Sequence, residues 1–202
     1  MFPDLLTDDS FRLETRRLWL RWPRTSDIPA LVKYADNLNV AQFTEHLPHP
    51  YRTSDADEFV RKSRQDNAGA KAIKLAITAK NRPNELIGSI GAEADEDRSI
   101  AIGYWLGEPF WGKGLMGEAV DEINALAFRT MALDRIKAYL VDGNTRSEHL
   151  LARRGFKPIG SGPYTMPLRG GTFMCTQFNL EEQVWRHNEP NRYKRQARKR
   201  AT

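Results

Sequence analysis

The residues between 107 and 117 have the types and spacing needed to hold a phosphate group. Three glycines, Gly107, Gly112 and Gly114, surround Lys113. Glycine lets the backbone approach a ligand closely, and the lysine adds a cation. A helical pattern follows, and a helix N-terminus presents free amides and the positive end of its dipole to an anion. The stretch therefore predicts a phosphate-binding loop.

Two regular elements must position this loop. The apolar and aromatic run Ile100–Leu106 predicts a strand that ends just before the first glycine. After the loop, apolar residues recur at spacings of three and four, which predicts an amphipathic helix. These residues are Met116, Ala119, Val120, Ile123, Leu126, Ala127 and Met131. Strand, glycine-rich loop and helix together form the expected anion site.

Two other interpretations of the loop remain open. Its glycines and lysine match the P-loop pattern of nucleotide-binding proteins except at the last position, where a Ser or Thr must hold magnesium. Gly114 stands there, so the magnesium ligand is missing. A P-loop-like nucleotide-binding module is therefore an alternative of another class. A plain strand–helix turn with incidental glycines is the other.

The segment from Trp111 to Met116 resembles the pyrophosphate loop of the Gcn5-related N-acetyltransferase (GNAT) superfamily, Gln/Arg-x-x-Gly-x-Gly/Ala. Trp111 and Met116 depart from that general pattern, but Trp-Gly-Lys-Gly followed by Glu118-Ala119 resembles the RimJ/RimL-like branch. The resemblance covers residues 17–180 and implies acetyl-coenzyme A (acetyl-CoA) as cosubstrate, without a metal. The residues implied in binding it are Tyr104, Trp105, Leu106, Gly112, Lys113, Gly114, Leu115, Met116, Gly117 and Asn144.

A second motif runs from Asn144 through Ser147 to Gly155-Phe156. Many superfamily members place a tyrosine four residues before the Gly-Phe pair, as the acid that reprotonates the coenzyme A thiolate. Leu151 occupies that position here. In the RimJ/RimL-like branch a serine lies near the thiol, so the resemblance implies Ser147 as the acid. Asn144 would bond the pantetheine or cap the following helix, and the two roles can coexist.

The base that removes a proton from the acceptor amine is less defined. The resemblance implies that backbone amides near residues 104–106 polarise the thioester carbonyl. Glu93, near the end of a central strand, could take the proton, although it could equally face solvent. Glu45 and His46 lie in a loop that borders the acceptor groove in the family, and they are candidate substrate-binding residues or alternative bases. Members of the branch often have a Glu where this chain has Ile159.

The order of predicted elements matches the acetyltransferase fold. We expect one α/β (α+β) domain with a mixed sheet of about six or seven strands, splayed at the acetyl-CoA site, and about four helices. Strands are predicted at 18–22, 74–78, 86–94, 100–106, 135–141, 156–164 and 172–180. Helices are predicted at 26–38, 54–67, 116–131 and 145–154, the second opened by a box of Ser54 and Asp57. Residues 1–16 are expected to form an extension, 17–182 the N-acetyltransferase domain and 183–202 a basic, disordered tail.

Composition describes a cytoplasmic protein. The 202 residues are 40% hydrophobic and 28% charged, and no apolar run approaches the roughly 18–20 residues of a membrane span. Cys175 is the single cysteine, which excludes an internal disulfide and favours a reducing compartment. With four scattered histidines the chain also offers no metal-ligand cluster.

The positive charge is concentrated at the C-terminus. Residues 192–202 carry six cations and no acid, so the net charge of +5 leaves −1 for residues 1–191. Such a run is typical of a solvated, disordered end. It could also attract RNA or another polyanion, such as the ribosome.

These observations predict an acetyl-CoA-dependent N-acetyltransferase acting on a primary amine. The acceptor expected from the branch is the N-terminal amine of a ribosomal protein. Antibiotics, polyamines and amino sugars are the small-molecule alternatives, and an RNA-binding module is an alternative of another class. The enzyme is expected to be a monomer or homodimer.

Overall fold

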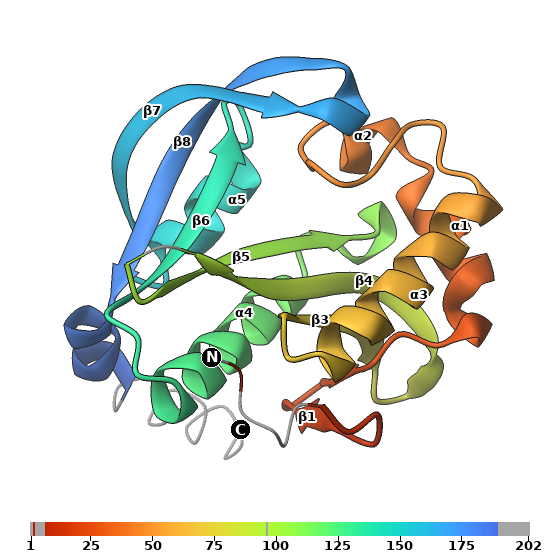
Figure 1. Ribbon diagram of the computed structural model, residues 1–202, viewed down its shortest axis with the longest axis horizontal. Helices are drawn as coiled ribbons and strands as arrows, with labels where there is room; N and C mark the ends of the chain where they lie inside the picture. Colours follow the sequence, from red (N-terminus) through yellow and green to blue (C-terminus); the bar gives the residue numbers. More distant parts are fainter. Residues whose placement is uncertain (1, 3–6, 96, 190–202) are drawn as a thin grey trace.

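The computed structural model describes residues 2, 7–95 and 97–189, and its centre is one mixed sheet of eight strands (Figure 1). Its spatial order is β1-β2-β3-β4-β5-β6-β8-β7, and only the β5–β6 pair is parallel. The strands are β1 (Arg12–Glu14), β2 (Leu18–Arg21), β3 (Ala72–Ala79), β4 (Arg82–Asp95), β5 (Ser99–Leu106), β6 (Arg135–Val141), β7 (Lys157–Met166) and β8 (Gly171–Glu181).

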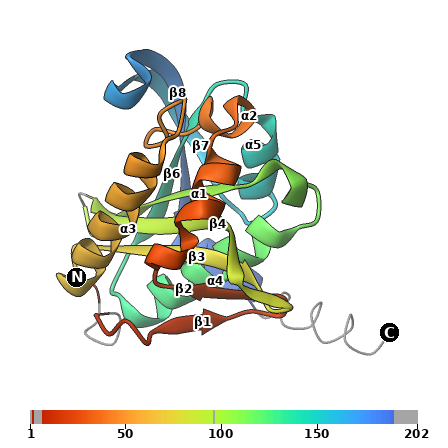
Figure 2. The same ribbon diagram turned by 90° about the vertical axis from the view of Figure 1, so that its right-hand side faces the viewer.

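Helices cover both faces of the sheet (Figures 1 and 2). They are α1 (Ile28–Ala35), α2 (Leu38–Ala41), α3 (Thr53–Ala68), α4 (Leu115–Thr130) and α5 (Thr145–Ala152), followed by a helix at 182–189. The core accordingly has two clusters. In one, Ile123 and other apolar residues of α4 pack on the sheet, and in the other, Leu31 of α1 and Val60 of α3 pack against it. Among the described residues, no helix is long and apolar enough to cross a membrane.

Strands β5 and β6 diverge after a short parallel stretch. Their pairing joins 99–101 to 135–137 and stops there, although β5 continues to Leu106 and β6 to Val141. Each strand is held on its other side, because β4 pairs with β5 as far as Leu106 and β8 pairs with β6 as far as Val141. The predicted splay of the central strands is therefore present, and the gap between them is visible in Figure 1.

The fold class is as predicted, but some elements differ. The sheet has eight strands instead of six or seven, because β1 lies inside the expected N-terminal extension and adds an edge strand to β2. Three residues are too few to show a strand periodicity. Residues 39–51, between the first two predicted helices, were expected to form a loop, but helix α2 takes up its first residues. The carboxylate at the start of α3 is that of Asp55, which accepts the Arg52 N–H at 2.7 Å, and not that of Asp57.

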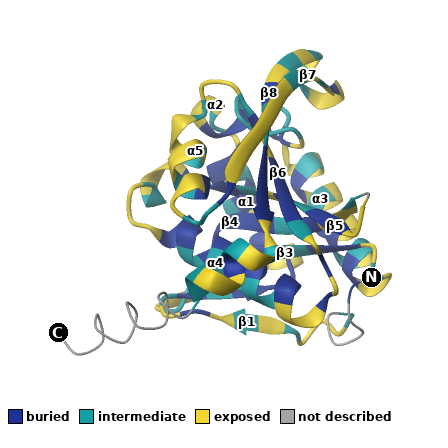
Figure 3. Ribbon diagram, turned by 90° about the vertical axis from the view of Figure 1, so that its left-hand side faces the viewer, coloured by how far each residue is buried: buried dark blue, intermediate teal, exposed yellow. Residues whose placement is uncertain are grey.

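The first residues of the expected disordered tail are ordered. Residues 182–189 are helical, and Trp185 is only 2% exposed, with its ring centroid 5.1 Å from that of Phe128 in α4. One large aromatic ring supplies this burial where no repeating apolar stripe exists. Residues 190–202, which include the basic run, lie outside the described residues. Figure 3 shows the buried residues concentrated in the central strands, with much of the β7–β8 hairpin exposed.

Candidate active site

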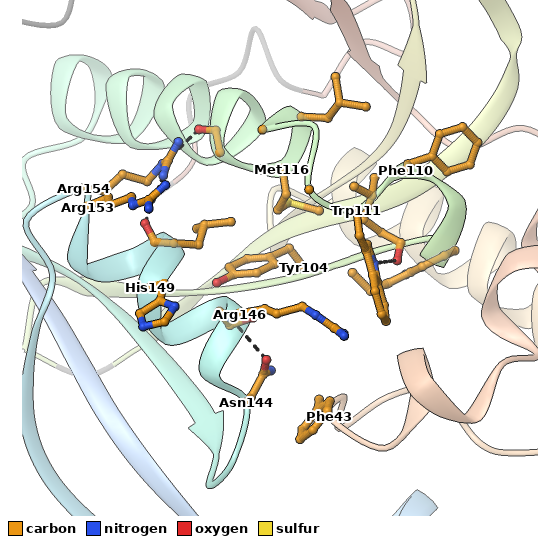
Figure 4. Close-up of a pocket in the computed structure, with 18 of the residues that line it drawn as sticks. Phe43, Tyr104, Phe110, Trp111, Met116, Asn144, Arg146, His149, Arg153 and Arg154 are labelled. Atoms are coloured by element: carbon orange, nitrogen blue, oxygen red, sulfur yellow. Dashed lines mark hydrogen bonds between the residues drawn. The ribbon is translucent and has the colours of Figure 1, made fainter.

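A cavity of about 1380 Å³ opens beside the end of β5 (Figure 4). Its walls come from four regions, of which the first two are consecutive in the sequence. They are the end of β5 at 104–106, the following loop and the first turn of α4, helix α5 with the residues after it, and α2 with Phe43 and Thr44. Nine of the ten predicted cofactor residues line this cavity, all except Lys113.

The glycine-rich loop has the backbone that its sequence predicts. Gly112 and Gly114 have φ angles of +73° and +71°, in the left-handed region that favours glycine. Gly114 is the N-cap of α4, so the free amides of Leu115 and Met116 come immediately after it at the cavity wall. A Cβ on Gly112 would meet nothing within 4 Å, which leaves the space beside the backbone open to a ligand. The loop therefore has the backbone geometry of an anion site.

Lys113 does not face the cavity. Its Nζ donates to the Pro109 carbonyl at 2.8 Å and lies 5.7 Å from the Phe110 ring centroid. The cationic side chains at the wall belong instead to Arg146, Arg153 and Arg154. None of these three arginines was among the predicted binding residues.

Arg146, His149 and Arg153 are spaced by three and four. That spacing indicates one helix face and could have identified this wall from the sequence. Arg146 also crosses to the glycine-rich loop, with its Cζ 4.1 Å from the Trp111 ring centroid (Figure 4).

The N-terminal segment holds the glycine-rich loop in place through hydrogen bonds to the loop and to α4. Arg17 Nη1 donates to the Lys113 carbonyl at 2.9 Å, and Arg17 Nε donates to Glu118 at 2.8 Å. Thr15 Oγ1 donates to the same carboxylate at 2.6 Å. Burial raises the pKa of Glu118, but the hydrogen bonds from Thr15 and Arg17 outweigh burial and leave the pKa below its ordinary value. Thr15 lies within the expected extension, so that segment supports the site.

Ser147 and Asn144 both line the cavity from the start of α5. Asn144 is the N-cap of α5, and its Oδ1 accepts the Ser147 N–H at 3.3 Å. The capping role predicted for Asn144 is therefore confirmed, while its contact with pantetheine stays a prediction. Leu151 is fully buried and supplies no proton donor.

Tyr104 brings a hydroxyl group to the same wall, whereas the sequence predicted only a backbone contact there. Its Oη is buried and lacks a hydrogen-bond partner among the described residues. Burial raises the pKa of Tyr104 to about 12, and the Ser147 hydroxyl and the charge of Arg154 counter part of that rise. The phenol therefore stays protonated at neutral pH. The alternation of side chains along β5 was too weak a signal to separate this tyrosine from a core residue.

The predicted base and acceptor residues lie outside this cavity. Glu93 Oε1 is 2.9 Å from Lys74 Nζ, so its charge is already paired. Glu45 accepts a hydrogen bond from the Tyr164 hydroxyl at 3.3 Å, and His46 Nε2 is 3.7 Å from the Glu45 carboxylate. None of the three is among the lining residues. Their catalytic and substrate-binding roles stay predictions.

Known proteins with similar sequence and structure include acetyltransferases. The chain is 30% identical over 150 residues to "Uncharacterized N-acetyltransferase p20" of Bacillus licheniformis, which covers 73% of this chain and 83% of that protein. Over 59 residues, 29% of this chain and 30% of the relative, it is 42% identical to the [ribosomal protein uS5]-alanine N-acetyltransferase of Escherichia coli. A structure of RimL, the ribosomal L7/L12 α-N-protein acetyltransferase in complex with coenzyme A, superposes with a TM-score of 0.72 at 20% identity, covering 85% of this chain and 98% of that one.

A family description also matches most of the chain. Residues 17–157 match the family described as "Acetyltransferase (GNAT) domain", which spans the glycine-rich loop, Ser147 and the Gly155-Phe156 pair. The matched residues include the splayed strands β5 and β6, the glycine-capped helix α4 and much of the cavity wall. The chain therefore belongs to the GNAT acetyltransferase family and is an N-acetyltransferase.

Proposed function

We propose that this enzyme transfers the acetyl group of acetyl-CoA to the N-terminal amine of a protein, with a ribosomal protein as the acceptor. One observation supports the reaction most strongly. A single cavity holds both an anion-binding loop, at 112–117, and a pair of hydroxyl groups, those of Tyr104 and Ser147. The partial match to a ribosomal-protein acetyltransferase supports the acceptor.

The lining residues fit acetyl-CoA. The amides that follow Gly114 would hold the pyrophosphate, and the arginines along one wall would balance its charge. The side of β5 that faces away from β4 has no strand partner beyond residue 101, which leaves its backbone groups near Tyr104 available to pantetheine. The Leu106 carbonyl already accepts the Trp111 Nε1–H at 2.6 Å. Acetyl-CoA would supply the acetyl thioester and the thiolate leaving group.

The two hydroxyl groups have distinct roles in this proposal. Only a neutral amine carries the lone pair that attacks the carbonyl carbon, so the acceptor must lose a proton. The carbon–sulfur bond breaks as the new amide bond forms, and negative charge collects on sulfur. The Ser147 hydroxyl would donate a hydrogen bond to that sulfur, and the Tyr104 hydroxyl would donate to Ser147. The thiolate then takes up one proton for the one the amine has lost.

The basic run at 192–202 would contribute weak, salt-sensitive contacts with RNA, which would favour a protein acceptor on the ribosome. A small-molecule amine is the second candidate acceptor, because the residues at the cavity wall specify only the cosubstrate.

Mass spectrometry of acetyl transfer to N-terminal peptides, ribosomal proteins, aminoglycosides and polyamines tests the proposal. The expected products are N-terminally acetylated peptides, formed only when acetyl-CoA is present. Acetylation restricted to a polyamine or aminoglycoside would overturn the proposed acceptor, but it would leave the reaction intact.

A further inference from the structure

Arg154 follows the end of α5 and links that helix to α4. Its Nε donates to the Gly117 carbonyl at 3.0 Å and lies 3.0 Å from Asp121 Oδ1, and both of these residues belong to α4. Its Nη2 also donates to Asp121, at 3.3 Å, whereas Nη1 donates to the Leu150 carbonyl of α5 at 3.0 Å. Figure 4 shows Arg154 lying between the two helices. Each nitrogen of this guanidinium therefore has an acceptor within the protein, and the group joins two helices that β6 separates along the chain.

Gly117 leaves the space that the guanidinium occupies. A Cβ on Gly117 would lie 1.9 Å from Arg154 Nη2 and 2.7 Å from Arg154 Cζ, well inside van der Waals contact. Gly117 lies within α4 and has no positive φ angle, so its backbone does not require glycine. Glycine inside a helix costs stability relative to alanine. The position of Arg154 therefore gives the physical reason for a glycine here.

The two helices carry the two groups that the proposed reaction needs. The N-terminus of α4, which Gly114 caps, would hold the pyrophosphate, and the first turn of α5 carries Ser147. Arg154 contacts each helix about one turn from these groups, at Gly117 in α4 and at Leu150 in α5. A link at this point sets how far the Ser147 hydroxyl lies from the anion site.

We propose that Arg154 is a positioning residue for acetyl transfer, bound in the space that Gly117 leaves free. It holds α5 against the first turn of α4, so that Ser147 reaches the thioester sulfur of a cosubstrate whose pyrophosphate is fixed at the anion site. Misplacing a reacting group by about 1 Å can cost roughly a hundredfold in rate. This inference rests on the proposed function and adds a residue that acts through Ser147.

Gly117→Ala tests the link without removing Arg154. The added methyl group displaces the far end of a flexible side chain, and alanine favours the helix, so a melt should show a folded protein. With any amine that the enzyme acetylates, we expect kcat to fall roughly tenfold, while the dissociation constant of coenzyme A rises less than about threefold. Gly160→Ala is the matched control and should keep its kcat, because a Cβ there meets nothing within 4 Å and the residue is not part of the cavity wall. A wild-type kcat in Gly117→Ala would contradict the proposal.

A double-mutant cycle shows whether Arg154 is the group that the methyl displaces. Arg154→Met removes the guanidinium and should lower kcat about as much as Gly117→Ala does. The double variant has room for the methyl group, so its kcat should match that of Arg154→Met alone. Two losses that multiply, to roughly a hundredfold, would refute the link.

Arg154→Lys separates positioning from direct phosphate binding. Lysine keeps the positive charge, but it lacks the planar fork that bonds two carbonyls and a carboxylate at once. We therefore expect it to behave like Arg154→Met. A direct phosphate contact would instead raise the dissociation constant of coenzyme A in Arg154→Met, leave kcat unchanged and be restored by lysine, and that pattern would overturn the proposal. Arg61→Met, which breaks an exposed pair with Glu58 on α3, is the control and should keep its kcat.

The Ser147→Ala background distinguishes failure of this inference from failure of the proposed function. There, Gly117→Ala should have little further effect on kcat, because the hydroxyl that the link positions is absent. A further tenfold loss would overturn the route through Ser147. A wild-type kcat in Ser147→Ala alone would refute the proposed role of the serine, whereas the cycle of Gly117 and Arg154 would still report whether the link between the helices supports catalysis.

Discussion

Replacing Tyr104 with Phe separates catalysis from stability. We expect kcat to fall, while the melting temperature stays the same or rises. The wild-type hydroxyl is buried without a partner among the described residues, and an unsatisfied buried polar group costs about 1–3 kcal/mol. Phenylalanine removes that cost and keeps the ring. The melting temperature should therefore stay the same or rise, by about 2–4 °C for each kcal/mol regained.

The expected loss of activity follows from proton affinities. The pKa of Tyr104 is raised to about 12, above the roughly 8.5 of an ordinary thiol, so the phenol does not hand over its proton outright. In the proposed mechanism it would act by hydrogen bonding through Ser147 to the developing thiolate. A hydrogen bond to a charged group contributes about 1.5–3 kcal/mol, and its transmission through a second hydroxyl reduces that value. We therefore expect kcat to fall roughly tenfold with little change in the KM for acetyl-CoA.

Steady-state kinetics with one fixed acceptor and a thermal melt of the same preparation provide the two readouts. Tyr34→Phe is the control. The Tyr34 hydroxyl donates a hydrogen bond of 2.6 Å to Glu85, and neither residue lines the cavity. That variant should lose a little stability and keep its kcat. A Tyr104→Phe enzyme with wild-type kcat would refute the role assigned to the hydroxyl. A lower melting temperature would show that the hydroxyl is satisfied in the native state.

Four further substitutions test the rest of the site. Gly114→Val should weaken acetyl-CoA binding, because a β-branched residue is strained at φ +71°, and titration calorimetry should show it. Ser147→Ala should lower kcat roughly tenfold to a hundredfold. Asn144→Ala should instead raise the KM for acetyl-CoA and lower the melting temperature, because the cap of α5 is lost. Equal effects of the two variants on kcat and KM would contradict these separate roles. Glu118→Gln should cost about 1–2 kcal/mol of unfolding free energy at neutral pH, because it breaks the bonds to Thr15 and Arg17. Since the folded pKa of Glu118 is lowered, its stabilisation is present above the unfolded value near 4.5 and is lost as pH falls through the folded pKa, so melts of variant and wild type should converge in acid.

Local sequence was sufficient where local geometry decides the outcome. The positive φ angles of Gly112 and Gly114, the start of α4 and the cap by Asn144 depend on neighbouring residues, and all could be predicted. Lys113 could not, because a flexible side chain pairs with whichever acceptor the fold brings close, here the carbonyl of Pro109. The glycine pattern shows where a phosphate can approach the backbone. It does not show which cation accompanies that phosphate.

Features that depend on contacts between distant segments could not be predicted from local sequence either. The three residues of β1 become a strand only because β2 is there to pair with them. Trp185 holds residues 182–189 as a helix through contact with Phe128, which is more than fifty positions earlier in the chain. The Tyr104 hydroxyl and Ser147 reach the same cavity wall only after α5 has packed beside β5. None of these contacts leaves a periodic signal within its own segment.

Equilibrium binding of coenzyme A is the most direct measurement of the central claim, that the cavity between α4 and α5 is the acetyl-CoA site. Titration calorimetry on the full chain should show saturable one-to-one binding of coenzyme A that Gly114→Val weakens, and no binding of ATP with magnesium. Binding of ATP with magnesium in the absence of any coenzyme A binding would contradict the assignment and support the P-loop interpretation.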